Sequence, residues 1–135
     1  MTNDKPDKPL RVAVWAAVST KEQAEDDKDS LPTQVAEGRA WAKGMGGQVV
    51  ATYWVPGHSR QYGFYDDAAR DMPAYRLLRE DAEGGKFDVL WCRERSRLGR
   101  TRALIAQVEY IVEEEGNAEV YSAAMPHQIG QKNAP

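Results

Sequence analysis

Apolar residues fall into four short runs along the chain, separated by polar segments that contain glycine and proline. Within each run the apolar character is nearly continuous rather than alternating. This pattern is typical of strands that are buried on both faces of a parallel sheet. The predicted strands are residues 10–18, 48–55, 87–92 and 118–124.

Between these strands, apolar residues recur at helical spacing in three segments. The first predicted helix follows Ser30, which can cap it, with Pro32 in the first turn. The second opens at Asp71 and Pro73, and the third follows Thr101, another capping residue. Glycines mark the three helix ends, at Gly44, Gly84 and Gly116. Residues 57–70 carry mixed charge and are expected to form a long loop.

Strands that alternate with helices imply parallel βαβ units. We therefore predict an α/β domain of three layers, with a mainly parallel sheet of four or five strands flanked by helices. Residues 1–9 are expected to form a flexible tail, residues 10–124 the domain, and residues 125–135 a C-terminal coil. Because the chain stops soon after the fourth strand, we expect it to be a domain of a longer protein.

The composition fits an ordinary globular protein, with 41% hydrophobic and 29% charged residues in a chain of 135. No apolar run approaches the roughly 20 residues that span a bilayer. The polar first nine residues lack the apolar segment of a signal peptide, so we expect a cytoplasmic protein without a membrane partner. The single cysteine, Cys92, excludes an intrachain disulfide and favours a buried structural thiol over a reactive one.

The net charge of −3 argues against indiscriminate coating of nucleic acid, but the charges are unevenly distributed. Acidic residues gather at 25–29 and 113–115. Arginines gather in one short segment after the third predicted strand: Arg93, Arg95, Arg97, Arg100 and Arg102.

Two candidate catalytic features are expected at one edge of the sheet. Ser19 directly follows the first strand, and the arginine segment follows the third. The carboxyl ends of parallel strands open at the same edge, where such sheets bind ligands. Attack by a serine hydroxyl on a phosphodiester builds negative charge on the phosphoryl oxygens, and guanidinium groups match that geometry. The pattern therefore favours metal-free phosphoryl transfer through a serine ester.

Less specific interpretations remain open for both features. A serine after a strand is often a turn or cap residue, and clustered arginines often form a solvated face or ion-pair network. A small-ligand domain, whose serine and arginines bind a phosphate or carboxylate, is a further alternative. The sequence contains neither the G-x-G-x-x-G nor the P-loop signature that would favour a nucleotide.

Four segments resemble motifs of one known family. Residues 15–23, WAAVSTKEQ, are similar to the Y-A-R-V-S-T-x-x-Q opening of the serine recombinases, the resolvase/invertase family. Residues 30–34, SLPTQ, resemble the family's S-L-x-x-Q. Residues 72–90 resemble its R-P-G-F…G-x-F-D stretch, and RSRLGR at 95–100 resembles its D-R-L-x-R motif. The order and spacing also agree, so the resemblance covers the N-terminal catalytic domain of a recombinase, of the large integrase type.

The resemblance implies a site-specific DNA recombinase. Ser19 would cut double-stranded DNA and become joined to the 5′ phosphate, without metal or other cofactor. Arg97 and Arg100 match the arginines that hold the phosphate, while Gln23 and Gln34 match glutamines that orient the nucleophile loop and nearby backbone. The full-length protein would self-associate to dimers and tetramers, and would recognise its site through a region outside this domain.

Three positions depart from the family pattern. Ala17, Met72 and Ser96 stand where the motifs have arginine, arginine and aspartate. Other arginines are candidates for contacting DNA phosphates: Arg70, Arg93 and Arg95. The departures predict reduced activity, and they support an alternative in which a catalytically impaired, recombinase-like domain acts in DNA binding or synaptic assembly.

Overall fold

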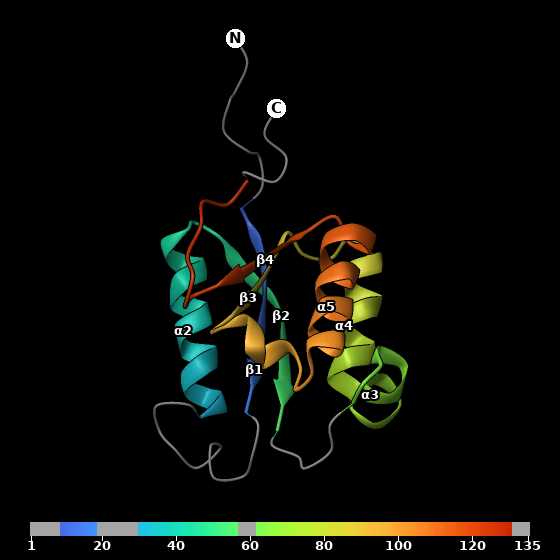
Figure 1. Ribbon diagram of the computed structural model, residues 1–135. Coiled ribbons are helices and arrows are strands. Elements are labelled where there is room, and N and C mark those ends of the chain that lie inside the picture. The colour runs from blue at the N-terminus through green and yellow to red at the C-terminus, as the bar shows by residue number, and fades with distance from the viewer. Residues whose placement is uncertain (1–8, 19–29, 57–61, 131–135) are drawn as a thin grey trace.

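The computed structural model describes residues 9–18, 30–56 and 62–130. Its four strands form one parallel sheet (Figure 1). Along the sheet the strand order is β2-β1-β3-β4. The strands are β1 (Arg11–Ala17), β2 (Gln48–Val55), β3 (Val89–Cys92) and β4 (Glu119–Ser122). β1 therefore lies inside the sheet, paired with β2 on one side and β3 on the other.

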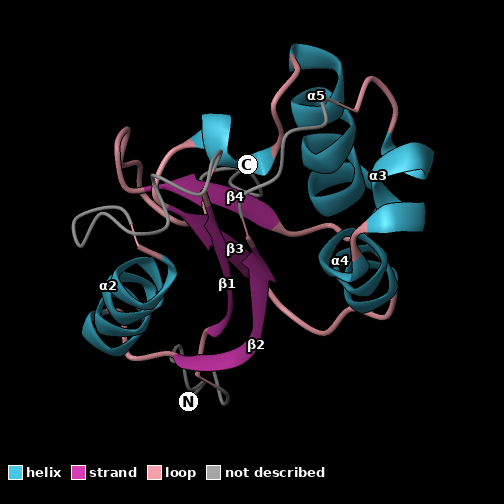
Figure 2. Cartoon of the chain, turned by 90° about the horizontal axis from the view of Figure 1, so that it is seen from below, coloured by secondary structure: helices cyan, strands magenta, loops and turns pink. Residues whose placement is uncertain are grey.

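Helices cover both faces of this sheet, as Figure 2 shows in end view. α2 (Leu31–Gly44) lies on one face, and α3 (Tyr65–Asp71), α4 (Pro73–Glu83) and α5 (Arg102–Tyr110) lie on the other. A 3-10 turn, η1 (Arg95–Leu98), follows β3, and a π-helical turn, η2 (Ile111–Glu115), extends α5. The predicted three-layer α/β domain with a parallel sheet is confirmed.

Alternate residues of β1 contribute to two separate cores. Its even-numbered residues from Val12 to Ala16 pack with α2, and its odd-numbered residues from Ala13 to Ala17 pack with α4 and α5. α2 approaches the sheet closely at Gly38, where an added Cβ would lie 2.8 Å from Val14 Cγ1 and 2.9 Å from Trp91 Cε3. Glycine at position 38 thus fixes the distance between α2 and the sheet, because any larger side chain must push the layers apart.

The structure corrects the prediction of a loop over residues 57–70. α3 begins at Tyr65 within that segment, with Tyr65 and Ala68 buried. The backbone N–H of Tyr65 donates to Gln107 Oε1 of α5 at 2.6 Å, which ties the start of α3 to the domain. A helix of two turns buries too few residues to leave a periodic apolar signal, and its tertiary contacts decide its formation.

Residues 1–8 of the predicted N-terminal tail and residues 131–135 of the predicted C-terminal coil lie outside the described residues. On the C-terminal side, the predicted coil makes an isolated antiparallel bridge between Ser122 and Met125. The backbone N–H of Gly130 donates to Glu119 Oε2 at 2.8 Å, which holds this segment against β4. No helix among the described residues is long and apolar enough to cross a membrane.

Cys92 should remain unreactive until the domain unfolds. Its side chain is fully buried, and burial raises the pKa of the thiol to about 12 from an ordinary value of 9.0. Above pH 9 the Cys92 thiol ionises in the unfolded chain, whereas in the folded chain it keeps its proton. This difference lowers the free energy of unfolding as the pH rises above 9, by about 1.4 kcal/mol per pH unit. Denaturant titrations from pH 7 to 10.5 should show this loss in the wild type. The Cys92→Ala variant is the control, and an equal alkaline loss there would contradict the assignment.

Candidate active site

The carboxyl end of β1 delivers the chain to one edge of the sheet, at the bottom of Figure 1. Ala17 and Val18 are buried, and the N–H of Val18 donates to the Val55 carbonyl at 3.2 Å. The backbone is therefore fixed up to the residue before Ser19. Ser19 and Gln23 themselves lie outside the described residues.

The Gln34 side chain completes the hydrogen bonding of β1 at this edge. Its Nε2 donates to the Ala17 carbonyl at 2.9 Å, and its Oε1 accepts from the Ala17 N–H at 3.1 Å. The pairing of β1 with β3 ends at Trp15 and Cys92, so the amide takes the place of a neighbouring strand for Ala17. Gln34 has no exposed surface, which makes both bonds fully desolvated.

Two buried aromatic side chains position the arginine turn η1. Trp15 Nε1 donates to the Arg97 carbonyl at 2.8 Å, and the Tyr75 hydroxyl donates to the Leu98 carbonyl at 3.0 Å. Both rings belong to the core on the α4 side of the sheet, and they meet edge to face with centroids 5.1 Å apart. Consecutive carbonyls of the turn are thereby tied to β1 and α4.

Arg97 and Arg100 line a small recess beside the end of β1. The volume of the recess is about 20 Å³, roughly the room that one water molecule needs. Arg97 Nη1 lies 3.5 Å from the Ala17 carbonyl oxygen, and the side chain is only 10% exposed. The structure thus brings these two predicted residues together directly before the position of Ser19.

The other three candidate arginines form ion pairs with the chain's own carboxylates. Arg93 contacts Glu37 of α2 through both Nε and Nη2. Arg95 Nη1 lies 2.5 Å from Glu109 Oε2 of α5. Exposed Arg70 pairs with two acidic residues of its own helix, Asp67 and Asp71. None of the three lines the recess, and their contact with DNA phosphates stays a prediction.

The three departures from the family pattern occupy different environments. Ala17 and Ser96 both line the recess beside Arg97, whereas Met72 links α3 to α4 and packs partly buried against the core. Two of the three departures thus lie in the recess that Arg97 and Arg100 line.

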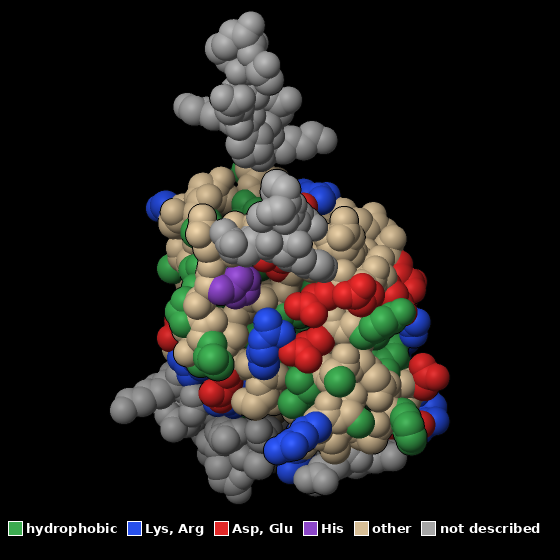
Figure 3. All heavy atoms as spheres, turned by 45° about the horizontal axis from the view of Figure 1, so that its top comes forward, with side chains coloured by type: hydrophobic (Ala, Val, Ile, Leu, Met, Phe, Trp, Pro, Cys, Tyr) green, Lys and Arg blue, Asp and Glu red, His purple; other side chains and the backbone are tan. Residues whose placement is uncertain are grey.

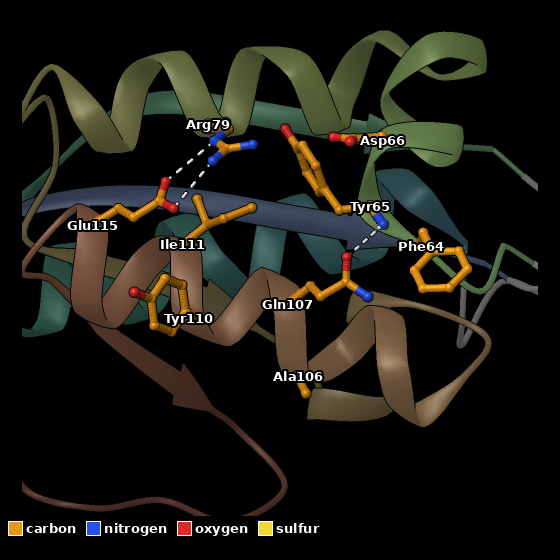
Figure 4. Close-up of a pocket in the computed structure, with 9 residues that line it drawn as sticks. All are labelled: Phe64, Tyr65, Asp66, Arg79, Ala106, Gln107, Tyr110, Ile111 and Glu115. Atoms are coloured by element: carbon orange, nitrogen blue, oxygen red, sulfur yellow. Dashed lines mark hydrogen bonds and ion pairs between the residues drawn. The ribbon is translucent and has the colours of Figure 1, made fainter.

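A larger groove lies between α3 and α4 on one side and α5 on the other (Figure 4). Its volume is about 490 Å³, but polar groups along it are engaged in holding the helices together. Arg79 pairs with Glu115 at 3.1 Å, and Gln107 accepts from the Tyr65 backbone. The groove therefore offers little support for the small-ligand alternative, which needs convergent polar groups to orient a ligand.

Acidic side chains gather on the face shown in Figure 3, beside a few basic ones and a histidine at the surface. The described histidine, His127, has its Nε2 3.4 Å from Glu119 Oε1. No group of three or more potential metal-ligating side chains occurs within the described ranges 9–18, 30–56 and 62–130.

Comparison with family models decides the relationship of this chain to known proteins. Residues 12–132 match the model described as Resolvase, N terminal domain. The chain belongs to the resolvase family. A comparison with curated proteins gave no match.

Solved structures support this placement in the resolvase family. The N-terminal catalytic domain of TP901-1 integrase is 27% identical, with a TM-score of 0.64 over 84% of this chain and 78% of that one. Two further structures, at lower identity, share the fold. The C-terminal catalytic domain of ISC1926 TnpA, an IS607-like serine recombinase, is 21% identical (TM-score 0.64; 84% and 70% covered). A resolvase family site-specific recombinase from Streptococcus pneumoniae is 19% identical (TM-score 0.66; 90% and 77% covered).

Several contacts at this site of the resolvase fold have no clear signal in the sequence. The hydrogen bonds from Trp15 and Tyr75 to η1 join residues far apart in the chain, and both side chains fit an apolar pattern. The contact between Glu94 and Arg97 has a weak signal in the sequence, because Glu94 stands three residues before Arg97 in an arginine-rich segment. This contact depends on the 3-10 turn, which apolar periodicity does not predict.

Proposed function

We propose that this chain is the catalytic domain of a site-specific DNA recombinase in which Ser19 is the nucleophile. The observation that carries the proposal is the position of Arg97 and Arg100, which line one recess with Ala17 and Val18, the residues just before Ser19. Family membership supports the same reaction. A hydroxyl emerging there would meet two guanidinium groups suited to a phosphodiester.

The proposed reaction exchanges one phosphate ester for another. The Ser19 Oγ–P bond forms as the P–O3′ bond of one DNA strand breaks; the hydroxyl loses its proton, and the 3′ oxygen gains one. Attack by a 3′ hydroxyl on the phosphoserine reverses both changes and rejoins the DNA. Negative charge develops on the phosphoryl oxygens in both directions, where Arg97 and Arg100 would stabilise it.

The remaining candidates have supporting roles in this proposal. Gln34 holds the backbone at Ala17 through two hydrogen bonds, and Gln23 would orient the loop that follows Ser19. Arg70, Arg93 and Arg95 would contact flanking phosphates after exchanging their carboxylate partners for DNA. In the proposed full-length protein, a region outside this chain selects the DNA site, and subunits assemble as dimers and tetramers.

The impaired-domain alternative rests on the same recess. Ala17 and Ser96 stand where the family motifs have an arginine and an aspartate, and both residues line the recess with Arg97. Removing one preorganised donor from such a site costs roughly 10²–10³ in rate. In this alternative the domain keeps the scaffold and binds DNA or assembles with an active partner without cutting.

Trapping of a covalent protein–DNA ester tests the proposal. We expect a denaturant-stable adduct between this chain and a duplex library, randomised in sequence, that carries 3′-bridging phosphorothiolates. The thiol leaving group is a poor nucleophile for rejoining, so the phosphoserine should accumulate. Ser19→Ala should abolish the adduct, while Thr52→Val, which removes a hydroxyl from β2, should retain it. Salt-dependent DNA binding without any adduct would overturn the enzyme proposal in favour of the impaired domain.

A further inference from the structure

We propose that Glu94 is a positioning residue that holds the Arg97 guanidinium in the orientation needed to bind phosphate. The inference rests on the proposed function, because it concerns the same site. Glu94 Oε1 accepts a hydrogen bond from Arg97 Nε at 3.2 Å. The contact is also an ion pair, because it joins a carboxylate to a guanidinium.

The local backbone places Glu94 and Arg97 side by side. Glu94 is extended and precedes η1, and the Arg97 N–H donates to the Glu94 carbonyl at 2.9 Å. In a 3-10 turn, which has three residues per turn, side chains at i and i+3 eclipse one another. The backbone bond that closes the turn therefore also sets the distance between the carboxylate and the guanidinium.

Glu94 contacts Arg97 from outside the recess rather than competing for its interior. Arg97 lines the recess and Glu94 does not. The Arg97 side chain is only 10% exposed, whereas that of Glu94 is 44% exposed, as expected for a residue outside the recess. The contact to Arg97 Nε is therefore made from the more exposed side of the guanidinium, outside the recess.

Two contacts on a planar group fix its direction. The Glu94 carboxylate holds Nε, and the Ala17 carbonyl lies 3.5 Å from Nη1. Because the guanidinium is rigid and planar, these two points determine where its remaining N–H bonds point. That Ala17 carbonyl is itself held by Gln34, so the orientation of Arg97 is tied to the end of β1.

The same contact bears on the serine at position 96. Ser96 borders the recess, and its hydroxyl cannot carry the negative charge that an aspartate would bring beside Arg97. Glu94 supplies a carboxylate to this arginine from two residues earlier in the chain. We infer that a carboxylate introduced at position 96 would take over the role of Glu94.

Variants of Glu94 test the proposal through the rate of adduct formation with the phosphorothiolate duplexes described above. Glu94→Ala should slow adduct formation by about 10- to 100-fold, since small displacements of a reacting group can cost about 10²-fold. Its affinity for DNA should change less than twofold, because the charge of Arg97 stays. Glu94→Gln keeps an oxygen for Nε and should fall between the wild type and Glu94→Ala.

The matched control is Glu83→Gln. Glu83 Oε2 contacts Arg79 Nε at the same distance of 3.2 Å and is similarly exposed, but lies in α4 away from the recess. This variant should form the adduct at the wild-type rate. Ser96→Asp introduced into Glu94→Ala should recover most of the lost rate. Loss of rate without recovery, or an equal loss in the control, would overturn the proposal.

A second measurement separates this proposal from the proposed function. In ¹⁵N-resolved NMR spectra, the Arg97 Nε–H should be protected from exchange in the wild type and lose that protection in Glu94→Ala. If the wild type forms no adduct, the proposed function fails, while loss of protection still supports the orientation of Arg97. Protection that persists in Glu94→Ala, or wild-type adduct rates in that variant, would refute the role of Glu94.

Discussion

Replacing Arg97 with alanine should lower the rate of ester formation with DNA by about 10²- to 10³-fold, the usual cost of losing one preorganised donor to a developing anion. The side chain lies beside the end of β1 and is 10% exposed, so solvent offers little compensation for its loss. Arg97→Lys should recover only part of the rate. An ammonium supplies charge without the planar fork, and it cannot donate to the Glu94 carboxylate and the Ala17 carbonyl in the same fixed geometry.

The fold should survive the Arg97→Ala substitution. Trp15 and Tyr75 hold η1 through backbone carbonyls, which alanine retains at position 97. Single-turnover trapping with phosphorothiolate duplexes measures the rate, and thermal unfolding checks the fold. Arg102→Ala is a matched control, because Arg102 is exposed in the first turn of α5 and should leave the rate unchanged. Equal losses in both variants would indicate a general effect of charge rather than a site at Arg97.

The order and approximate positions of the strands and helices could be predicted from the sequence, because each depends on residues that are close together in the chain. The boundaries of β2 agree with the predicted run, and the caps expected at Ser30 and Thr101 both accept hydrogen bonds from the following turn. β3 and β4 are shorter than their apolar runs. Apolar residues such as Phe87 and Ala118 are buried beyond the ends of these ladders, so burial alone overestimates strand length.

The partners of the individual arginines after β3 could not be predicted from the sequence. These arginines are close in the chain, yet Arg93 pairs with Glu37 of α2 and Arg95 with Glu109 of α5. Which arginine faces the recess depends on the 3-10 turn and on carboxylates brought from distant elements. Spacing could therefore place the cluster at the right sheet edge, but not divide it between phosphate candidates and ion pairs.

The role of Gln34 leads to the second large effect. We expect Gln34→Leu to reduce the free energy of unfolding by about 2–5 kcal/mol, because both Gln34 hydrogen bonds to Ala17 are lost in a buried site and the carbonyl keeps only its 3.5 Å contact with Arg97. It should also slow ester formation in protein that remains folded, since Ala17 immediately precedes Val18 and Ser19. Gln34→Glu keeps an acceptor for the Ala17 N–H but loses the donor to the carbonyl and buries a charge, so it should destabilise the domain as well.

Denaturant unfolding and trapping at low temperature separate these two consequences of changing Gln34. Gln48→Leu makes the same chemical change at the exposed start of β2 and should alter stability by less than about 0.5 kcal/mol. If Gln34→Leu is as stable as Gln48→Leu, the amide does not substitute for a strand partner at Ala17. If it is destabilised yet forms the ester at the wild-type rate, β1 positions Ser19 without Gln34. Slow ester formation in folded protein would instead link the buried hydrogen bonds of Ala17 to the placement of the nucleophile.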